Sequence, residues 1–451
     1  MVFLGMSLEG GGSERAGPVV GSGAAMDTVA TRRPAWALAA TAWVLAAGVA
    51  VFDTAHYLHP PTSARLGDLH VYLVAVHALL HGHSLYGAHP GLRSGFTYPP
   101  FAALLLIPLA LVPEAAAQVT WTLLTLAATG ALSYLVARAL PRRLGPAAAV
   151  WPALTALLLA SKPLQSNLAF GQVSVFLALG VVADLLARRG RRYQGALTGL
   201  CAALKLTPLV FVPYLWLTGR RRAAGVALGT FGAATALAGL GAPGNSRSFW
   251  GGEVFHVTRG LPLAEGGNQS IYGVLLRAGA HGAALGALWA VLSGGALVLG
   301  LWRARRACEA GQPVLGLAIT GCAGILASPI SWTHHELWVL LGAAGVFTAS
   351  TGADIAVAAV ILVPMVIGLP GAHLLGPPGR WLAANDRSVL AALVACVLPF
   401  RDLTGSRPGP TGPGGARRGA QPAAQWRDVS TVEISRHHRQ PWGPSPSGSP
   451  E

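Results

Sequence analysis

The sequence predicts an all-α polytopic membrane protein, and three features support that fold class. Of its 451 residues, 53% are hydrophobic and only 11% are charged, whereas a typical soluble domain carries about 25% charged residues. The mean hydropathy is +0.52, and several apolar runs approach or exceed the ~20 residues that a helix needs to cross a bilayer. Short arginine clusters separate these runs, as the positive-inside rule predicts for cytoplasmic loops.

The arginine clusters set the expected number of crossings. They lie at residues 32–33, 142–143, 188–192, 220–222 and 303–306. If every cluster faces the cytoplasm, the intervening segments cross in pairs and both termini are cytoplasmic, which predicts about 10–12 transmembrane helices. The expected spans are roughly 35–52, 115–139, 146–161, 173–187, 223–241, 280–301, 313–327, 337–350, 354–370 and 388–400.

Two apolar segments do not fit a simple crossing. Residues 98–113, YPPFAALLLIPLALVP, are short for a span and bounded by prolines, so they either lie in the outer interface or enter and return. Residues 195–219 have basic clusters at both ends, and a single crossing would violate the charge rule. Two half-helices broken at KLTP satisfy the rule, because Pro208 removes a backbone donor.

The two ends of the chain are expected to lie outside the membrane domain, which we place at 34–400. Residues 1–33 are rich in Gly and Ser and lack the apolar core of a signal peptide, so we predict a disordered segment, with Met26 as an alternative translation start. Residues 401–451 are rich in Pro, Gly, Ser and Arg and are predicted to form a disordered, basic cytoplasmic tail.

Charge and cysteine usage argue against several functional classes. The net charge of +15 comes from arginines clustered between spans, which is not the pattern of a nucleic-acid-binding surface. The four cysteines are scattered without a C-x-x-C pair. We therefore predict that they are packing residues, and we expect no disulfide frame, metal site or cofactor.

The predicted topology gathers the unusual polar residues on one side of the membrane. The loops expected on the outer side are 53–114, 162–172, 242–271, 328–336 and 371–387. An active site is therefore expected on the extracytoplasmic face of a multi-pass protein of the cell membrane.

The first outer loop contains a predicted interfacial helix at 67–87. Apolar residues recur there at three- and four-residue spacing and histidines occupy the opposite side, as in an amphipathic helix on a membrane surface. Asp68 opens the helix, either as an N-cap or as a carboxylate that faces a substrate. The histidines lack a ligand spacing such as H-E-x-x-H, so we interpret them as surface residues at the headgroup level.

The chain has only two lysines, and neither lies in a cytoplasmic cluster. Lys162 belongs to SKPLQSNLAFGQ at the outer end of a span pair, together with Gln172. Lys205 lies in the middle of an apolar segment, where an unpaired charge is costly. It either extends toward the interface or binds a phosphate, since lysine binds phosphate as a point charge.

Two later loops hold further polar clusters. GGNQSIYG at 266–273 contains Asn268 and Gln269, which we interpret as a polar patch in an outer loop rather than a glycosylation site. SPISWTHHELW at 328–338 contains Trp332, His334 and His335. This second cluster is either an ordinary aromatic belt with interfacial histidines or the border of a site.

The order and company of these motifs resemble glycosyltransferase family 87, which includes polyprenol-phosphate-mannose-dependent mannosyltransferases of actinobacteria. The similarity extends over about residues 36–400. The motifs that carry it are GDLHVY, GHSLYG, FTYPPF, NLAFGQVSVFLAL, GLCAALKLTPLVFVPYLW, GGNQSIYGVLLR and SPISWTHHELW.

The resemblance implies a GT-C type bundle with its active site at the outer leaflet. It also implies inverting transfer of a hexose, mannose first of all, from a polyprenyl-phosphate donor to a hydroxyl of a glycolipid or polysaccharide. By resemblance, Asp68 matches the catalytic aspartate and His334–His335 the late HH motif. The expected substrate-binding residues are Lys205, Lys162, Tyr72, Gln172, Asn268, Gln269 and Trp332.

The choice of base stays open between Asp68, His334 and His335. A carboxylate shielded from water has a raised pKa and becomes a better base near neutrality, which favours Asp68. The alternative function is a lipid-linked-sugar flippase or another transporter, since broken helices and intramembrane charge also occur in those proteins. A membrane scaffold is a third class, but it gives no reason to gather an aspartate, a lysine and two histidines.

Overall fold

The computed structural model describes residues 23–87, 95–141, 146–256, 258, 261–347 and 351–398. These residues form α-helices joined by short 3-10 and π-helical turns, and no β-strand occurs among them. The prediction of an all-α polytopic membrane fold is confirmed. The ends at 1–22 and 401–451 lie outside the described residues, and helix α1 begins at Gly23, ahead of the predicted boundary at 34.

The helices follow one another along the chain with short connections. The first half holds α1 (Gly23–Leu58), α2 (Gly67–Leu80), α3 (Pro100–Ala110), α4 (Glu114–Ala139), α5 (Ala147–Leu159), α6 (Lys162–Phe170), α7 (Ser174–Val182), α8 (Ala196–Leu204) and α9 (Phe211–Leu217). The second half holds α10 (Arg221–Gly241), α11 (Pro243–Gly251), α12 (Ile271–Arg277), α13 (Gly282–Glu309), α14 (Pro313–Ala327), α15 (Leu337–Val346), α16 (Gly352–Ile367) and α17 (Gly376–Ala392).

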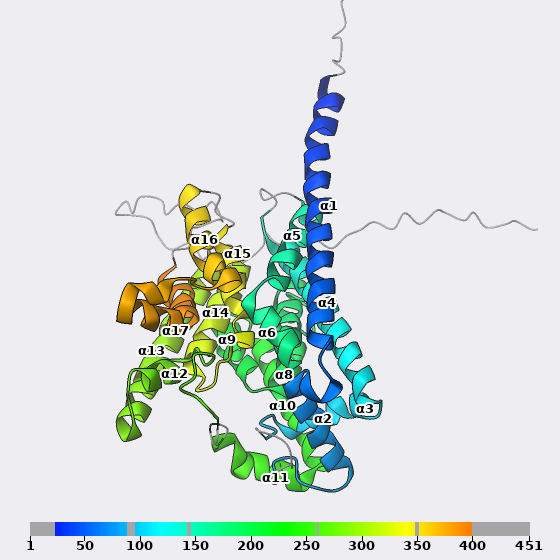
Figure 1. Ribbon diagram of the computed structural model, residues 1–451, viewed down its shortest axis with the longest axis vertical. Helices are drawn as coiled ribbons and strands as arrows, with labels where there is room; N and C mark the ends of the chain where they lie inside the picture. The colour runs from blue at the N-terminus through cyan, green and yellow to red at the C-terminus, as the bar shows by residue number, and fades with distance from the viewer. Residues whose placement is uncertain are drawn as a thin grey trace, which may run out of the picture. The chain divides into compact units, whose positions relative to one another are not determined.

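Several single turns connect or extend these helices. The 3-10 turns are η1 (Thr62–Ala64), η4 (Thr207–Val210), η5 (Glu253–Phe255), η6 (Thr333–His335) and η8 (Ala372–Leu375). The π-helical turns η3 (Ala183–Ala187) and η9 (Leu393–Val397) extend α7 and α17. In Figure 1, α2, α3 and α11 lie together at one end of the helices, and α16 lies at the other.

Four helices of the described chain are long and apolar enough to cross a membrane: Trp36–Leu58 of α1, α4, α10 and α13. A fifth crossing results if α5 and α6, which meet at an angle of 62°, form one bent span. The other apolar helices have 10–17 residues, and at 1.5 Å per residue all of them are shorter than the ~30 Å hydrocarbon core. The count of about 10–12 spans therefore stays a prediction.

The two unusual segments adopt short helices. The chain breaks at Lys205 and Leu206 between α8 and α9, so the predicted pair of half-helices at KLTP is confirmed. Residues 100–110 form α3, which packs against α2. The prediction that 371–387 is a loop is wrong, because η8 and α17 cover most of it. The polar residues of α17 interrupt any apolar run, so the sequence pattern does not indicate a helix here.

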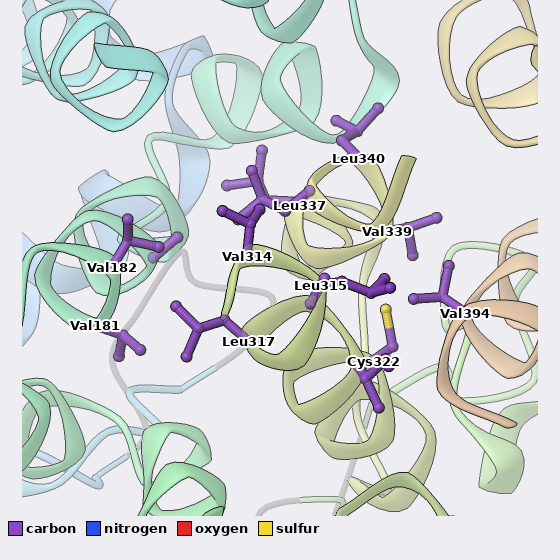
Figure 2. Close-up of a cluster of buried hydrophobic side chains, with 14 of the residues drawn as sticks. Val181, Val182, Val314, Leu315, Leu317, Cys322, Leu337, Val339, Leu340 and Val394 are labelled. Carbon is purple, nitrogen blue, oxygen red and sulfur yellow. The ribbon is translucent and has the colours of Figure 1, made fainter. Parts of the chain in front are cut away.

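Helix α14 lies at the centre of the main core. Nearly all of its side chains are buried, and it packs against α13, α15 and η9. Figure 2 shows side chains of α14 between those of α7, α15 and η9. The labelled residues are Val181, Val182, Val314, Leu315, Leu317, Cys322, Leu337, Val339, Leu340 and Val394.

Truncating the centre of this core should destabilise the protein. Leu315 is fully buried, so Leu315→Ala leaves a cavity and lowers the free energy of unfolding by about 2–5 kcal/mol. Leu240→Ala is the matched control, because that side chain is 83% exposed. Thermal unfolding in detergent should show a lower Tm for Leu315→Ala alone, and equal Tm values for the two variants would contradict the assigned core.

Candidate active site

Loops that are far apart in the sequence meet around one cavity of about 340 Å³. The start of α2, the segment before α3, the turn between α6 and α7, the break after α8 and the turn η6 all contribute to its wall. The cavity is lined by Asp68, Tyr98, Gln172, Lys205, Trp332 and His335, with His334 beside them. The structure therefore brings polar residues of several separate segments together at one cavity.

Asp68 lies in the first turn of α2 and faces this cavity. The residue that caps the helix is Leu66, which has a left-handed backbone (φ 50) and no side-chain cap. The N-cap interpretation of Asp68 is therefore wrong. Its carboxylate instead accepts a hydrogen bond from the side-chain amide of Gln172.

Gly171 allows α2 to approach the turn that carries Gln172. Its φ of +69 suits glycine. A Cβ atom built at this position would lie only 2.7 Å from Cβ of Leu69. The motif FGQ therefore has a physical reason, since the glycine permits the contact that brings the amide of Gln172 to Asp68.

The environment of Asp68 perturbs its acidity. Burial raises the pKa of its carboxyl above the ordinary value, and the hydrogen bond from Gln172 and the charge of Lys205 lower that pKa in part. Among the described residues that line the cavity, Asp68 is the only carboxylate. A partly shielded carboxylate of this kind is suited to accept a proton.

Two tyrosines connect Asp68 with Lys205. The hydroxyl of Tyr98 donates to Oε1 of Gln172 at 3.0 Å, and the hydroxyl of Tyr72 lies 2.8 Å from that of Tyr98. Nζ of Lys205 lies 3.4 Å from the same Tyr98 hydroxyl and 5.1 Å from the centre of its ring. Tyr98 thus contacts both the lysine and the amide that binds Asp68.

Lys205 is presented by the break between the half-helices. Its backbone is extended (φ −153, ψ 131), so the side chain leaves the axis of α8 and enters the cavity. Nζ lies 2.6 Å from Nε2 of His335. The amine is therefore held inside the protein, and an interpretation as a side chain extending to the interface does not fit this contact.

The two histidines of η6 have different surroundings. Nδ1 of His335 accepts a hydrogen bond from the backbone N–H of Trp332 at 3.1 Å. Nδ1 of His334 lies 3.4 Å from Oγ of Ser166, and its Nε2 has no hydrogen-bond partner in the described part of the chain. Burial, aided by the charge of Lys205, holds the pKa of both imidazoles well below the ordinary value, which keeps them neutral.

Three of the predicted site residues are absent from the lining of this cavity: Lys162, Asn268 and Gln269. Lys162 is exposed at the start of α6. Asn268 and Gln269 are fully buried, and their amides bond to backbone groups. Conversely, Phe96, Tyr98 and Phe249 line the cavity without having been selected. Phe96 and Tyr98 belong to the motif FTYPPF, which could have indicated them. However, this extended segment before a short helix has no periodicity from which the direction of its rings can be predicted.

A second cavity of about 520 Å³ adjoins the first and is almost entirely apolar. It lies between α3, α4 and α7 and shares Tyr72, Phe96 and Tyr98 with the polar cavity. Leu105 and Leu124 on its rim are about half exposed. No group of three or more His, Cys, Asp or Glu side chains within the described ranges could hold a metal ion.

Comparisons with known proteins agree on one family. A family model described as glycosyltransferase family 87 matches residues 96–329. A polyprenol-phosphate-mannose-dependent alpha-(1-2)-phosphatidylinositol mannoside mannosyltransferase of Mycobacterium tuberculosis is 37% identical over 328 residues, 68% of this chain and 75% of that protein. Its namesake from Mycolicibacterium smegmatis is 36% identical over 306 residues, 60% of this chain and 68% of that protein.

A third relative is named for a larger acceptor. A polyprenol-phosphate-mannose-dependent alpha-(1-2)-phosphatidylinositol pentamannoside mannosyltransferase of Mycobacterium tuberculosis is 32% identical over 295 residues, 62% of this chain and 66% of that protein. No solved structure matches the chain.

The ionised carboxylate of Asp68, which is half-buried, should lower the stability of the folded protein. Because the pKa of Asp68 is raised in the folded state, ionisation opposes folding, and the cost appears above the ordinary aspartate pKa of about 3.9 and is complete above the folded pKa. Asp68→Asn should therefore raise the Tm near neutral pH, with a gain that shrinks as the pH falls.

Asp184→Asn provides the contrast in the same melting experiment. Asp184 accepts hydrogen bonds from the backbone of Gly195 and from both the backbone and hydroxyl of Thr198. Its amide variant should lower the Tm. A lower Tm for Asp68→Asn as well would contradict the assigned environment of Asp68.

Proposed function

The chain belongs to glycosyltransferase family 87, and from that premise we propose that it transfers mannose from a polyprenyl-phosphate donor to a hydroxyl of a membrane glycolipid. The observation that carries the proposal is the cavity in which one carboxylate faces a half-buried lysine and histidine, beside an apolar cavity that shares its aromatic wall. The acceptor we propose is a phosphatidylinositol mannoside, the acceptor class for which the relatives are named.

Asp68 is the base in this proposal. The acceptor hydroxyl attacks the anomeric carbon of the mannose, its proton passes to the carboxylate of Asp68, and a new C–O bond forms with inversion. The bond between the anomeric carbon and the phosphate oxygen breaks, and polyprenyl phosphate leaves with the electron pair. The position of Asp68 supports its role as the base, because it is the carboxylate at this cavity and is partly shielded from water.

Lys205 and His335 bind the phosphate of the donor. Negative charge grows on the leaving phosphate as the sugar departs, and donors already in place stabilise it without reorganisation. A lysine and a ring N–H at one point of the cavity supply two such donors. A phosphate also gives the half-buried amine of Lys205 the anionic partner that the described residues do not place in contact with it.

The apolar cavity is the proposed place of the first isoprene units. Donors of this class have a charged head and a hydrocarbon tail, and a site for them needs adjoining polar and apolar compartments. The two cavities meet at Tyr72, Phe96 and Tyr98. The proposed orientation, with the site at the extracytoplasmic side, follows from the arginine clusters.

Transfer of labelled mannose from synthetic polyprenyl phosphomannose to a mannolipid tests the function. Asp68→Asn should lower kcat by about 10²–10⁴-fold, whereas His77→Ala, an exposed histidine of the same helix, should leave it unchanged. Loss of activity in His335→Ala with full activity in Asp68→Asn would move the base to η6. Relocation of the donor by reconstituted protein without any product would favour a flippase.

The pH dependence of transfer should follow Asp68. Activity should fall as the pH decreases through the raised pKa of this carboxyl, because only the carboxylate accepts the proton. Gln172→Leu removes a hydrogen bond that lowers this pKa, so the acid limb of kcat/KM should move to higher pH. An unmoved acid limb would show that a group other than Asp68 controls it.

A further inference from the structure

The segment 266–270 is bonded to the loop that precedes η6. The backbone N–H of Gln269 donates to the carbonyl of Ser331 at 2.7 Å, and Asn268 and Trp332 form an isolated antiparallel bridge. A Cβ atom at Gly267 would lie 3.2 Å from the Trp332 ring, so this segment also packs closely on the indole. The two motifs that looked like separate polar patches in the sequence are one structural unit.

Asn268 is the centre of this unit. Its Oδ1 accepts from the backbone N–H of Ser331 at 2.9 Å, and its Nδ2 donates to the carbonyl of Pro329 at 3.2 Å. The same Nδ2 also lies 3.1 Å from the carbonyl of Leu263. The side chain is fully buried. An amide side chain supplies one acceptor and the two donor hydrogens that these carbonyls require, so Asn268 sets the path of the backbone up to Trp332.

The backbone N–H of Trp332 decides which nitrogen of His335 is protonated. This N–H can only donate, and it points to Nδ1 of His335 at 3.1 Å. A neutral imidazole carries one proton, and the low pKa of the buried ring keeps it neutral. Since Nδ1 accepts, the proton must be on Nε2, the nitrogen that lies 2.6 Å from Nζ of Lys205.

We propose that Asn268 is a positioning residue that, through the backbone N–H of Trp332, holds His335 in the tautomer with its proton on Nε2. This inference rests on the proposed function, in which that N–H donates to the phosphate of the donor. In the opposite tautomer Nε2 would be an acceptor facing a phosphate oxygen, and the contact would be repulsive. The same tautomer removes His335 from the possible bases, because both ring nitrogens are committed.

The same tautomer makes Lys205 and His335 a pair of donors. The lysine is charged in its effect on Asp68 and on the imidazoles, and neither an ammonium nor an Nε2–H offers the other an acceptor. An anionic phosphate accepts from both groups, so the pair is arranged to bind one phosphate through two donors.

The tautomer is directly measurable by ¹⁵N NMR of the full chain labelled at histidine. The chain has 14 histidines, and the His335 signals are those missing from the spectrum of His335→Gln. We expect a protonated Nε2 and an unprotonated Nδ1 in the wild type, and a mixed population in Asn268→Ala. A protonated Nδ1 in the wild type would overturn the proposal, as would an Asn268→Ala spectrum identical to that of the wild type.

Two substitutions at Trp332 separate the effect of its backbone N–H from the effect of its indole ring. Trp332→Ala removes the indole and keeps the N–H, whereas Trp332→Pro removes both. The φ of −71 at this residue suits proline. We expect kcat for mannose transfer to be about tenfold or more lower in Trp332→Pro than in Trp332→Ala, as for loss of one preorganised donor. Equal kcat values would overturn the proposal.

A double-mutant cycle separates positioning from simple support of the fold. Asn268→Ala should lower kcat at least about tenfold in the wild type and change it less than about twofold in His335→Gln, whose amide needs no tautomer. Additive losses would show that Asn268 acts on the fold and would overturn the proposal. Gln194→Ala is the matched control, because this amide is also buried and its Nε2 donates to the backbone carbonyl of Asp184.

The experiments distinguish failure of the inference from failure of the proposed function. If the wild type transfers mannose and the double-mutant cycle is additive, the proposed function is supported and the proposed role of Asn268 is wrong. If the wild type transfers no mannose, the function falls, and the NMR spectrum still decides the tautomer because it requires no turnover.

Discussion

The placement of a half-buried lysine amine beside a histidine is the constraint on which the rest of the site depends. An amine removed from water needs partners, and in this chain they must come from other segments, because Lys205 leaves the helix at a break. The hydroxyl and ring of Tyr98 fill that role, and Nε2 of His335 lies 2.6 Å from the amine. Each of these partners in turn requires its own support, and this requirement brings the loops together.

The support of the site is arranged in two directions. Toward Asp68, Tyr98 and Gln172 form a chain of hydrogen bonds that ends on the carboxylate. Toward the opposite wall, Trp332 and Asn268 hold His335 from behind. Such fully bonded polar networks give a site one geometry rather than several, since any misplaced member leaves a buried polar group unsatisfied. The groups that still have hydrogen-bonding capacity then face the cavity.

The two adjoining cavities differ in the polarity of their lining. Lining side chains are polar where loops meet and apolar where α3, α4 and α7 meet, and Tyr72 and Tyr98 line both cavities. Two tyrosines hydrogen-bonded to each other at 2.8 Å can form such a boundary without burying an unpaired hydroxyl. A substrate with a charged head and a hydrocarbon tail matches this arrangement.

The sequence by itself determined the all-helical membrane class, the broken segment at KLTP and the short list of polar residues from which the site is drawn. These depend on local properties: apolar runs, prolines, and charges that are costly in a membrane. Only the tertiary structure decided that Gln172 reaches Asp68, that Tyr98 joins them to Lys205, and that Asn268 and Gln269 lie behind the site. The helix at 376–392 was likewise hidden, because its polar face is bonded to other loops. Such long-range contacts depend on how helices pack and on single permissive positions such as Gly171, and no periodicity along the chain records them.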